Sequence, residues 1–182
     1  MDLPPDCKFH VFVSHVWSSG QDKTHSLVEK LRKYVSGIKV WLDVENLTNM
    51  ESLESSVGES AVFVLMYTDG YFMSKNCRLE VCAAVRSGRP TIVLYEGDDN
   101  TVKKMKECCL ARCNVEEGLS GDDILGHILV EDALLWLGAS SRYFAIASVK
   151  ELSLKILKRL PYHQRNVQDL PSGLKFNDYL FL

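Results

Sequence analysis

The sequence predicts an α/β domain built on a doubly wound, five-stranded parallel sheet with helices on both faces. Five short β-rich runs alternate with stretches of helical periodicity along the 182 residues. Two of these runs, 61–67 and 91–95, are apolar at successive positions instead of at every second one. Such continuous apolar runs are typical of central parallel strands that helices cover on both sides. With 46% hydrophobic residues, the chain can also bury one sizeable core.

The expected strands and helices follow one another in the order that this architecture requires. Strands are expected at 9–13, 39–42, 61–67, 91–95 and, with a weaker pattern, 133–137. Apolar residues recur at helical spacing in three stretches: Leu27, Val28, Leu31 and Val35; Cys77, Val81, Ala84 and Val85; and Val149, Leu152, Ile156 and Leu160. This alternation favours the strand order 2-1-3-4-5 of flavodoxin-like sheets.

That strand order predicts where a ligand would bind. In such sheets the ligand crevice lies beyond the carboxyl ends of the strands, where the order reverses between the first and third. Ser14 and His15 follow the first strand, Asp43 follows the second, and the turn at 68–71 follows the third. We therefore expect these residues to surround one crevice.

The predicted domain covers residues 8–160, and 161–182 form an extension or linker, because two prolines and a loss of periodicity follow Leu160. A net charge of -3 leaves no basic excess for a polyphosphate backbone, so nucleic acid is not an expected partner. The longest apolar run, 61–67, is far shorter than the ~20 residues that cross a bilayer, and residues 1–8 lack a signal-peptide pattern. We expect a soluble, cytoplasmic domain without membrane contact by this segment.

The six cysteines are expected to be free thiols and not disulfides. Cys108, Cys109 and Cys113 form a C-C-x₃-C cluster, but no second Cys or His pair at zinc-like spacing accompanies it. No metal site is therefore expected.

Three segments, taken in order and spacing, resemble a TIR (Toll/interleukin-1 receptor) domain. They are FHVFVSHVWSSGQD, KVWLDVENL and GYFMSKNCRLEVCAAV. The resemblance covers roughly residues 8–160 and is strongest in the first hundred. Many TIR domains of this type resemble NAD⁺ hydrolases in which a glutamate on the helix after the third strand is essential. The S-x-x-C-x-x-E pattern puts that glutamate at Glu80, and NAD⁺ would be the substrate, with no further cofactor.

The sequence around Glu80 indicates that this residue does not serve to cap the helix. Ser74 is a natural N-cap, which makes Cys77 the third helical residue and leaves Glu80 too far along to close a capping box. On a helical wheel Glu80 lies beside the apolar stripe of Cys77, Val81 and Ala84. Its carboxylate is therefore expected to be partly shielded from water.

One carboxylate is enough for the implied reaction. Ordinary glycosides need an acid to protonate the leaving oxygen as well as a second carboxylate, whereas the nicotinamide of NAD⁺ is already cationic and departs neutral. Only the oxocarbenium-like ribose then needs stabilisation, which a fixed negative charge in a water-poor crevice supplies.

The other candidate residues have two interpretations each. Trp17 and Trp41 are candidates to stack on the nicotinamide or adenine ring, or to belong to the core. Asp43 would touch a ribose or order the loop after it. Ser14 and His15 are candidates for contact with phosphate or ribose, although an arginine pair that some animal members carry just after them is absent here.

The segment 44–50 occupies the loop that resembles the TIR self-association loop. In enzymatic members this loop contacts a neighbouring subunit and helps to complete the site, so the resemblance implies activation by self-association in signalling or innate defence. The alternative is a non-enzymatic adaptor that acts only through contacts between TIR domains. Such an adaptor would keep the fold and the loop but would not need a shielded acid at Glu80.

Overall fold

The computed structural model describes residues 3–42, 52–115, 118–138 and 142–160. Their elements, in chain order, are β1 (Phe9–Ser14), α1 (Trp17–Tyr34), β2 (Val40–Trp41), α3 (Ser52–Gly58), β3 (Ser60–Tyr67), η1 (Tyr71–Met73), α4 (Lys75–Arg86), β4 (Thr91–Tyr95), α5 (Asp99–Arg112), α6 (Gly121–Ile128), β5 (Leu134–Leu135) and α7 (Arg142–Arg159).

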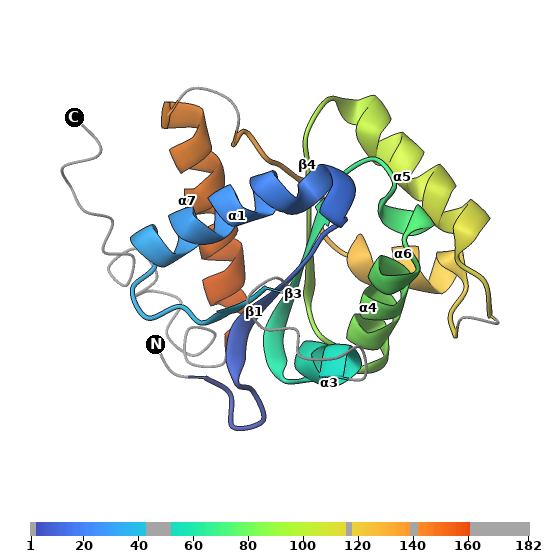
Figure 1. The fold of residues 1–182 in the computed structure, drawn as a ribbon, viewed down its shortest axis with the longest axis horizontal. Helices are drawn as coiled ribbons and strands as arrows, with labels where there is room; N and C mark the ends of the chain where they lie inside the picture. The colour runs from blue at the N-terminus through green and yellow to red at the C-terminus, as the bar shows by residue number, and fades with distance from the viewer. Residues whose placement is uncertain (1–2, 43–51, 116–117, 139–141, 161–182) are drawn as a thin grey trace.

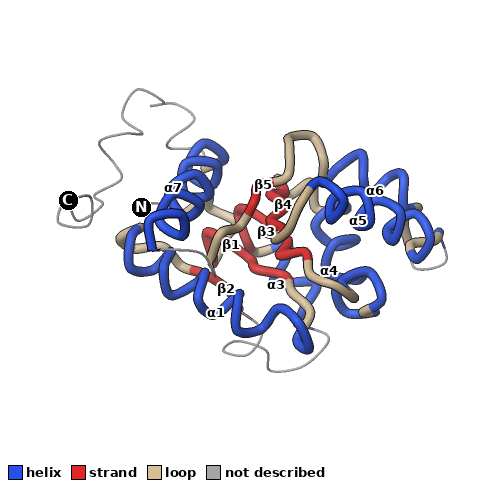
Figure 2. The backbone as a smooth tube through the Cα atoms, turned by 90° about the horizontal axis from the view of Figure 1, so that it is seen from above, coloured by secondary structure: helices blue, strands red, loops and turns tan. Residues whose placement is uncertain are grey.

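The five strands form one sheet in the order β2-β1-β3-β4-β5, and every pair is parallel. This confirms the predicted strand order, with its reversal between β1 and β3. Helices α1 and α7 cover one face, and α3, α4, α5 and α6 lie on the other (Figures 1 and 2). All strands therefore end at the same edge, and the segments that follow β1 and β3 are neighbours there.

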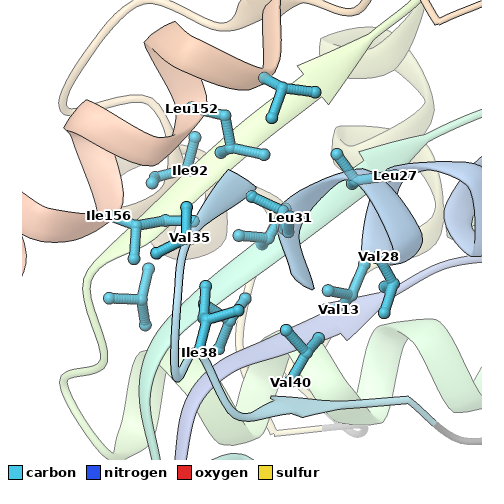
Figure 3. Packing of buried hydrophobic residues seen from close by; sticks show 14 of the residues in the cluster. Val13, Leu27, Val28, Leu31, Val35, Ile38, Val40, Ile92, Leu152 and Ile156 are labelled. Carbon is cyan, nitrogen blue, oxygen red and sulfur yellow. The ribbon is translucent and has the colours of Figure 1, made fainter. Parts of the chain in front are cut away.

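Alternate residues of each central strand enter two separate cores, because successive side chains point to opposite faces of a sheet. Val13 and Ile92 pack with Leu31 of α1 and Leu152 of α7 on one face (Figure 3). The other face is aromatic: Phe12 packs on this side with residues of α3, α4, α5 and α6. All eight residues of β3 are buried, which confirms that the apolar run is a strand covered on both sides.

The outer strands are shorter than expected. The predicted strand at 39–42 is reduced to Val40–Trp41, and that at 133–137 to Leu134–Leu135, whereas Thr91–Tyr95 is confirmed at both ends. Both are edge strands, and each pairs with a single neighbour, so fewer ladder hydrogen bonds extend them than extend a central strand. Helices α3, α5 and α6 were not predicted.

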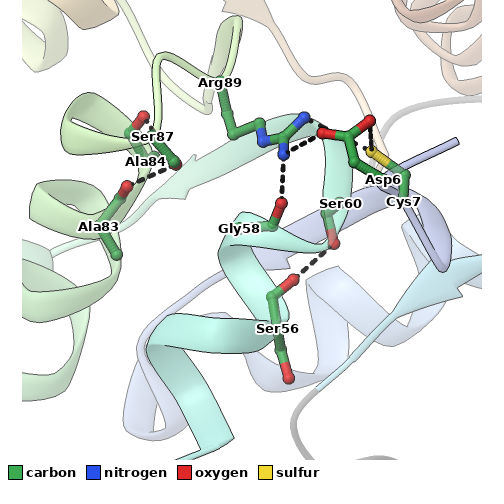
Figure 4. A network of polar contacts seen from close by, with 9 residues as sticks. All are labelled: Asp6, Cys7, Ser56, Gly58, Ser60, Ala83, Ala84, Ser87 and Arg89. Atoms are coloured by element: carbon green, nitrogen blue, oxygen red, sulfur yellow. Dashed lines mark hydrogen bonds and ion pairs between the residues drawn. The ribbon is translucent and has the colours of Figure 1, made fainter. Parts of the chain in front are cut away.

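Arg89 links the amino-terminal segment to the sheet at the edge where the strands begin, opposite their carboxyl ends (Figure 4). Its Nη2 lies 2.8 Å from Oδ2 of Asp6 and also donates to the carbonyl oxygen of Gly58. Its Nη1 lies 3.4 Å from Sγ of Cys7, which is buried. Arg89, which precedes β4, thus contacts the segment before β1 and the last residue of α3.

Candidate active site

Glu80 lies in α4, whose start the sequence predicts correctly. Ser74 is the N-cap, and its hydroxyl accepts a hydrogen bond from the backbone nitrogen of Cys77 at 3.4 Å. A serine in this position satisfies one of the amide groups that the first turn leaves unpaired. Glu80 follows almost two turns later and is only 5% exposed, so its shielding is more complete than the sequence suggests.

Ser14, at the end of a central strand, is a hydrogen-bond partner of Glu80. It is the last residue of β1 and lies on the same face as Phe12, two residues earlier, which is the face that α4 covers. Its Oγ donates a hydrogen bond to Oε2 of Glu80. Ser14 is 1% exposed, so this contact between the strand end and the helix is shielded from water.

Tyr71 is a third member of this cluster, and sequence reasoning missed it as a site residue. Its phenol oxygen lies 2.5 Å from Oγ of Ser14. Gly70, with φ of +89°, turns the chain after β3 into η1, a conformation that favours glycine. Arg78 then donates to the carbonyl oxygen of Phe72 at 2.8 Å, which holds η1 against α4. The sequence does point to the 68–71 turn, but no spacing rule singles out the tyrosine.

The phenol of Tyr71 keeps its proton over a wide pH range. Its side chain is completely buried. This burial, together with the nearby Cys77 and Glu80, holds the pKa of Tyr71 well above its ordinary value. Tyr71 is therefore a neutral hydrogen-bond donor beside a carboxylate.

His15 and Trp17 follow β1 but differ in exposure. His15 is buried, and its carbonyl oxygen accepts a hydrogen bond from Sγ of Cys77 at 3.4 Å, which is a second link between the end of β1 and α4. Trp17 is the first residue of α1 and is 58% exposed. It is the predicted aromatic residue whose ring remains accessible to a ligand.

Trp41 belongs to the core in this structure. It is 2% exposed, and its ring stacks on Phe12 with centroids 4.2 Å apart and planes 9° apart. A substrate ring would have to displace this packing to stack on it, so the geometry favours Trp17 over Trp41 as a stacking residue. Asp43 and the predicted self-association loop at 44–50 lie outside the described residues.

A second polar feature lies at the carboxyl edge of the sheet, beyond β3 and β4. It is a pocket of about 260 Å³ whose walls include Thr68, Asp69 and Glu96. Two contacts cross between its walls: Ser19 bonds to Thr68 at 2.8 Å, and Lys23 pairs with Glu96 at 2.5 Å. Because Lys23 neutralises the charge of Glu96, that carboxylate is less suited than the Glu80 cluster to stabilise a cation.

The described residues, 3–42, 52–115, 118–138 and 142–160, contain neither a metal site nor a membrane-spanning helix. No group of three or more His, Cys, Asp or Glu side chains is arranged there to hold a metal ion. Cys109 and Cys113 have sulfur atoms 3.9 Å apart, and all six cysteines are free thiols. None of the helices in these ranges is both long enough and apolar enough to cross a bilayer.

The chain is similar in sequence to a known family of domains. A family model described as the TIR domain matches residues 11–109, which is more than half of the chain. Among solved structures, a metazoan TIR-STING receptor from C. gigas is similar with a TM-score of 0.46 and 13% sequence identity. That match covers 93% of this chain and 55% of the receptor chain. No curated protein matches the sequence. By the extent of the family match, the chain belongs to the TIR domain family.

Proposed function

We propose that this TIR domain is an NAD⁺ nucleosidase in which Glu80 is the catalytic residue. The observation that carries the proposal is the position of the Glu80 carboxylate, 5% exposed and hydrogen bonded to Ser14 at the carboxyl end of β1. Ligands of parallel α/β sheets bind at this edge, where the strand order reverses. A shielded carboxylate at that point has no role in capping α4, because Ser74 already caps it.

The reaction needs little from the protein beyond this charge. Water replaces nicotinamide at the anomeric carbon of the ribose, so that NAD⁺ and water give nicotinamide, ADP-ribose and a proton. The leaving bond breaks ahead of water attack, which puts positive charge on the ribose. A carboxylate fixed in a low-dielectric site stabilises that charge more strongly than one in bulk water. If a nucleophilic nitrogen of the adenine replaces water, the product is a cyclic isomer of ADP-ribose.

The remaining candidate residues fit around this centre. A ribose in contact with Glu80 would also meet Ser14, because the two side chains are hydrogen bonded. The exposed ring of Trp17 begins α1 three residues after Ser14 and offers a face for nicotinamide or adenine. His15 and Asp43 stay predicted contacts for the phosphates and ribose.

We also propose that a neighbouring TIR domain completes the site through the segment 44–50, which lies outside the described residues. An open site admits water that screens the carboxylate, and a second subunit would exclude it. A head-to-tail contact of this kind propagates into a filament unless its rotation closes a ring. Such an arrangement would couple cleavage to assembly in a signalling or defence response.

The competing function is that of an adaptor that works only by TIR–TIR contact. Incubating the purified protein with NAD⁺ and separating nicotinamide, ADP-ribose and cyclic products distinguishes the two. The proposal expects nicotinamide to accumulate in step with NAD⁺ loss. An adaptor would leave NAD⁺ intact at every protein concentration, including those at which the chain self-associates.

A further inference from the structure

Three oxygen atoms from three separate elements form one buried chain. They belong to Tyr71 of η1, Ser14 at the end of β1 and Glu80 of α4. The phenol oxygen of Tyr71 contacts Oγ of Ser14 at 2.5 Å, and that same Oγ contacts Oε2 of Glu80. All three side chains are at most 5% exposed. Each bond therefore forms where water offers little competition.

The number of hydrogens fixes the direction of this chain. A serine hydroxyl has one hydrogen, and Ser14 donates it to the Glu80 carboxylate. The contact between Ser14 and Tyr71 must then use the hydrogen of the phenol. Burial favours the protonated phenol of Tyr71, so this donor is retained. The order is Tyr71 to Ser14 to Glu80, and each donor polarises the next bond.

We propose that Tyr71 is a positioning residue that acts on Glu80 through Ser14. The chain holds Oε2 of Glu80 in one orientation and favours the ionised carboxylate, which a neutral donor stabilises without adding a counter-charge. The catalytic consequence rests on the proposed NAD⁺ cleavage. The effect on the ionisation of Glu80 does not depend on it.

The ring of Tyr71 has a separate packing role that an appropriate substitution preserves. It meets the ring of Phe72 edge-on, with centroids 5.1 Å apart, and lies 6.4 Å from the ring of Tyr67. Tyr71→Phe keeps this ring and removes only the hydroxyl. Tyr67→Phe is the matched control, because Tyr67 is a buried tyrosine of the same cluster whose hydroxyl is outside the Tyr71–Ser14–Glu80 chain.

The other titratable groups around the chain stay the same in every variant. Cys77 of α4 and Cys113 after α5 both act on Tyr71, and His15 contacts Cys77 through its backbone carbonyl. Because none of them is substituted, their influence on Glu80 is common to the parent and the variants. Differences between the variants then report the effect of the Tyr71–Ser14–Glu80 hydrogen bonds alone.

A double-mutant cycle tests the proposal with two readouts. Ser14→Ala, Tyr71→Phe and the double variant are compared for kcat and KM on NAD⁺, and for the pH titration of the Glu80 side-chain carboxyl by ¹³C NMR, with the signal assigned by Glu80→Gln. Loss of a hydrogen bond to a charged group predicts a kcat for Ser14→Ala about tenfold or more below the parent. Tyr71→Phe should show a smaller loss of kcat with little change in KM, because Tyr71 has no proposed contact with the substrate. In both single variants the carboxyl should titrate at higher pH. The double variant should match Ser14→Ala in both readouts, because the proposed effect of Tyr71 on Glu80 passes through the hydroxyl of Ser14.

Several results would overturn the proposal. If the losses in the double variant multiply, Tyr71 acts independently of Ser14. If the Glu80 carboxyl of Tyr71→Phe titrates as it does in the parent and in Tyr67→Phe, and kcat is also the same, the phenol of Tyr71 does not act on Glu80. Should Ser14→Ala fail to fold, the titration of the Glu80 carboxyl in Tyr71→Phe alone decides whether the phenol acts on Glu80. If the parent does not cleave NAD⁺ but the carboxyl titration shifts as expected, the positioning chain stands and the proposed function fails.

Discussion

Ser14, at the carboxyl end of β1, donates a hydrogen bond to the carboxylate of Glu80, 66 residues later in the chain. The bond links the sheet to α4 at the edge where the strand order reverses. It also gives a shielded carboxylate a polar partner, without which burial of the charge would be costly. The candidate catalytic group is thus held by the sheet as well as by its own helix.

Tyr71 should make the protein less stable at alkaline pH. Its folded-state pKa is raised by burial, whereas in the unfolded chain the phenol ionises near pH 10, as tyrosine ordinarily does. The phenol of Tyr71 therefore loses its proton first in the unfolded state. The contribution of the buried neutral phenol to the free energy of unfolding is complete below about pH 10 and is lost as the pH rises further. Tyr71→Phe should show a shallower fall of the urea midpoint between about pH 9 and 11. Tyr143→Phe, at an exposed tyrosine, is the control; equal slopes in all three proteins would refute the assignment.

Loss of the Arg89 side chain should lower the free energy of unfolding more than loss of a nearby surface ion pair. Arg89→Ala removes the bonds to Asp6 and the Gly58 carbonyl, which are made by a side chain only 18% exposed, and should cost about 1–3 kcal/mol. Lys8→Ala breaks the pair with Glu59, in which the lysine is 69% exposed, and should cost at most about 1 kcal/mol. Urea unfolding of both variants checks this. Similar losses in both would contradict the network described for Arg89.

Trp17→Ala should weaken substrate binding with little effect on stability. The ring is 58% exposed at the start of α1, so few core contacts are lost. Stacking of a base on an aromatic ring contributes about 1–3 kcal/mol, which predicts a rise in KM for NAD⁺ of roughly tenfold. Tyr143→Ala, at another exposed aromatic residue, should leave KM unchanged. An unchanged KM in Trp17→Ala would remove this tryptophan from the site.

Specific activity should rise with protein concentration if a neighbouring chain completes the site. Leu47→Asp, in the segment 44–50, should flatten this rise because it puts an unpaired charge into the proposed contact. Activity over a hundredfold dilution series, with light scattering on the same samples, measures both effects. Constant specific activity in a protein that stays monomeric would mean that one chain holds a complete site.

The sheet could be predicted from the sequence because its central strands carry a strong signal. The runs at 61–67 and 91–95 are apolar on both faces, and this pattern identifies a parallel strand independently of its neighbours. The weaker elements depend on tertiary context. Helix α5 (Asp99–Arg112) is rich in lysine and has little amphipathic pattern. Its packing with α3, α4 and α6 on one face of the sheet is therefore not visible in the sequence.

The candidate site could be predicted only in part, for a similar reason. Ser74, Cys77 and Glu80 are close in sequence, so capping rules and helical spacing fix their relation. The contact between Ser14 and Tyr71 joins residues 57 positions apart, and depends on how the turn at Gly70 directs η1. Sequence periodicity carries no information on such a contact.

The most direct test of the account is the rate of NAD⁺ cleavage by Glu80→Gln. Glutamine keeps the shape of the side chain and can still accept the hydrogen bond from Ser14, but it lacks the charge that would stabilise the ribose cation. Glu151→Gln, at an exposed glutamate of α7, is the matched control. With folding checked by circular dichroism, nicotinamide release should fall by a factor on the order of 10² to 10³ or more in Glu80→Gln and stay at the parent rate in Glu151→Gln. Cleavage at the parent rate by a folded Glu80→Gln protein would contradict the assignment of Glu80 as the catalytic residue.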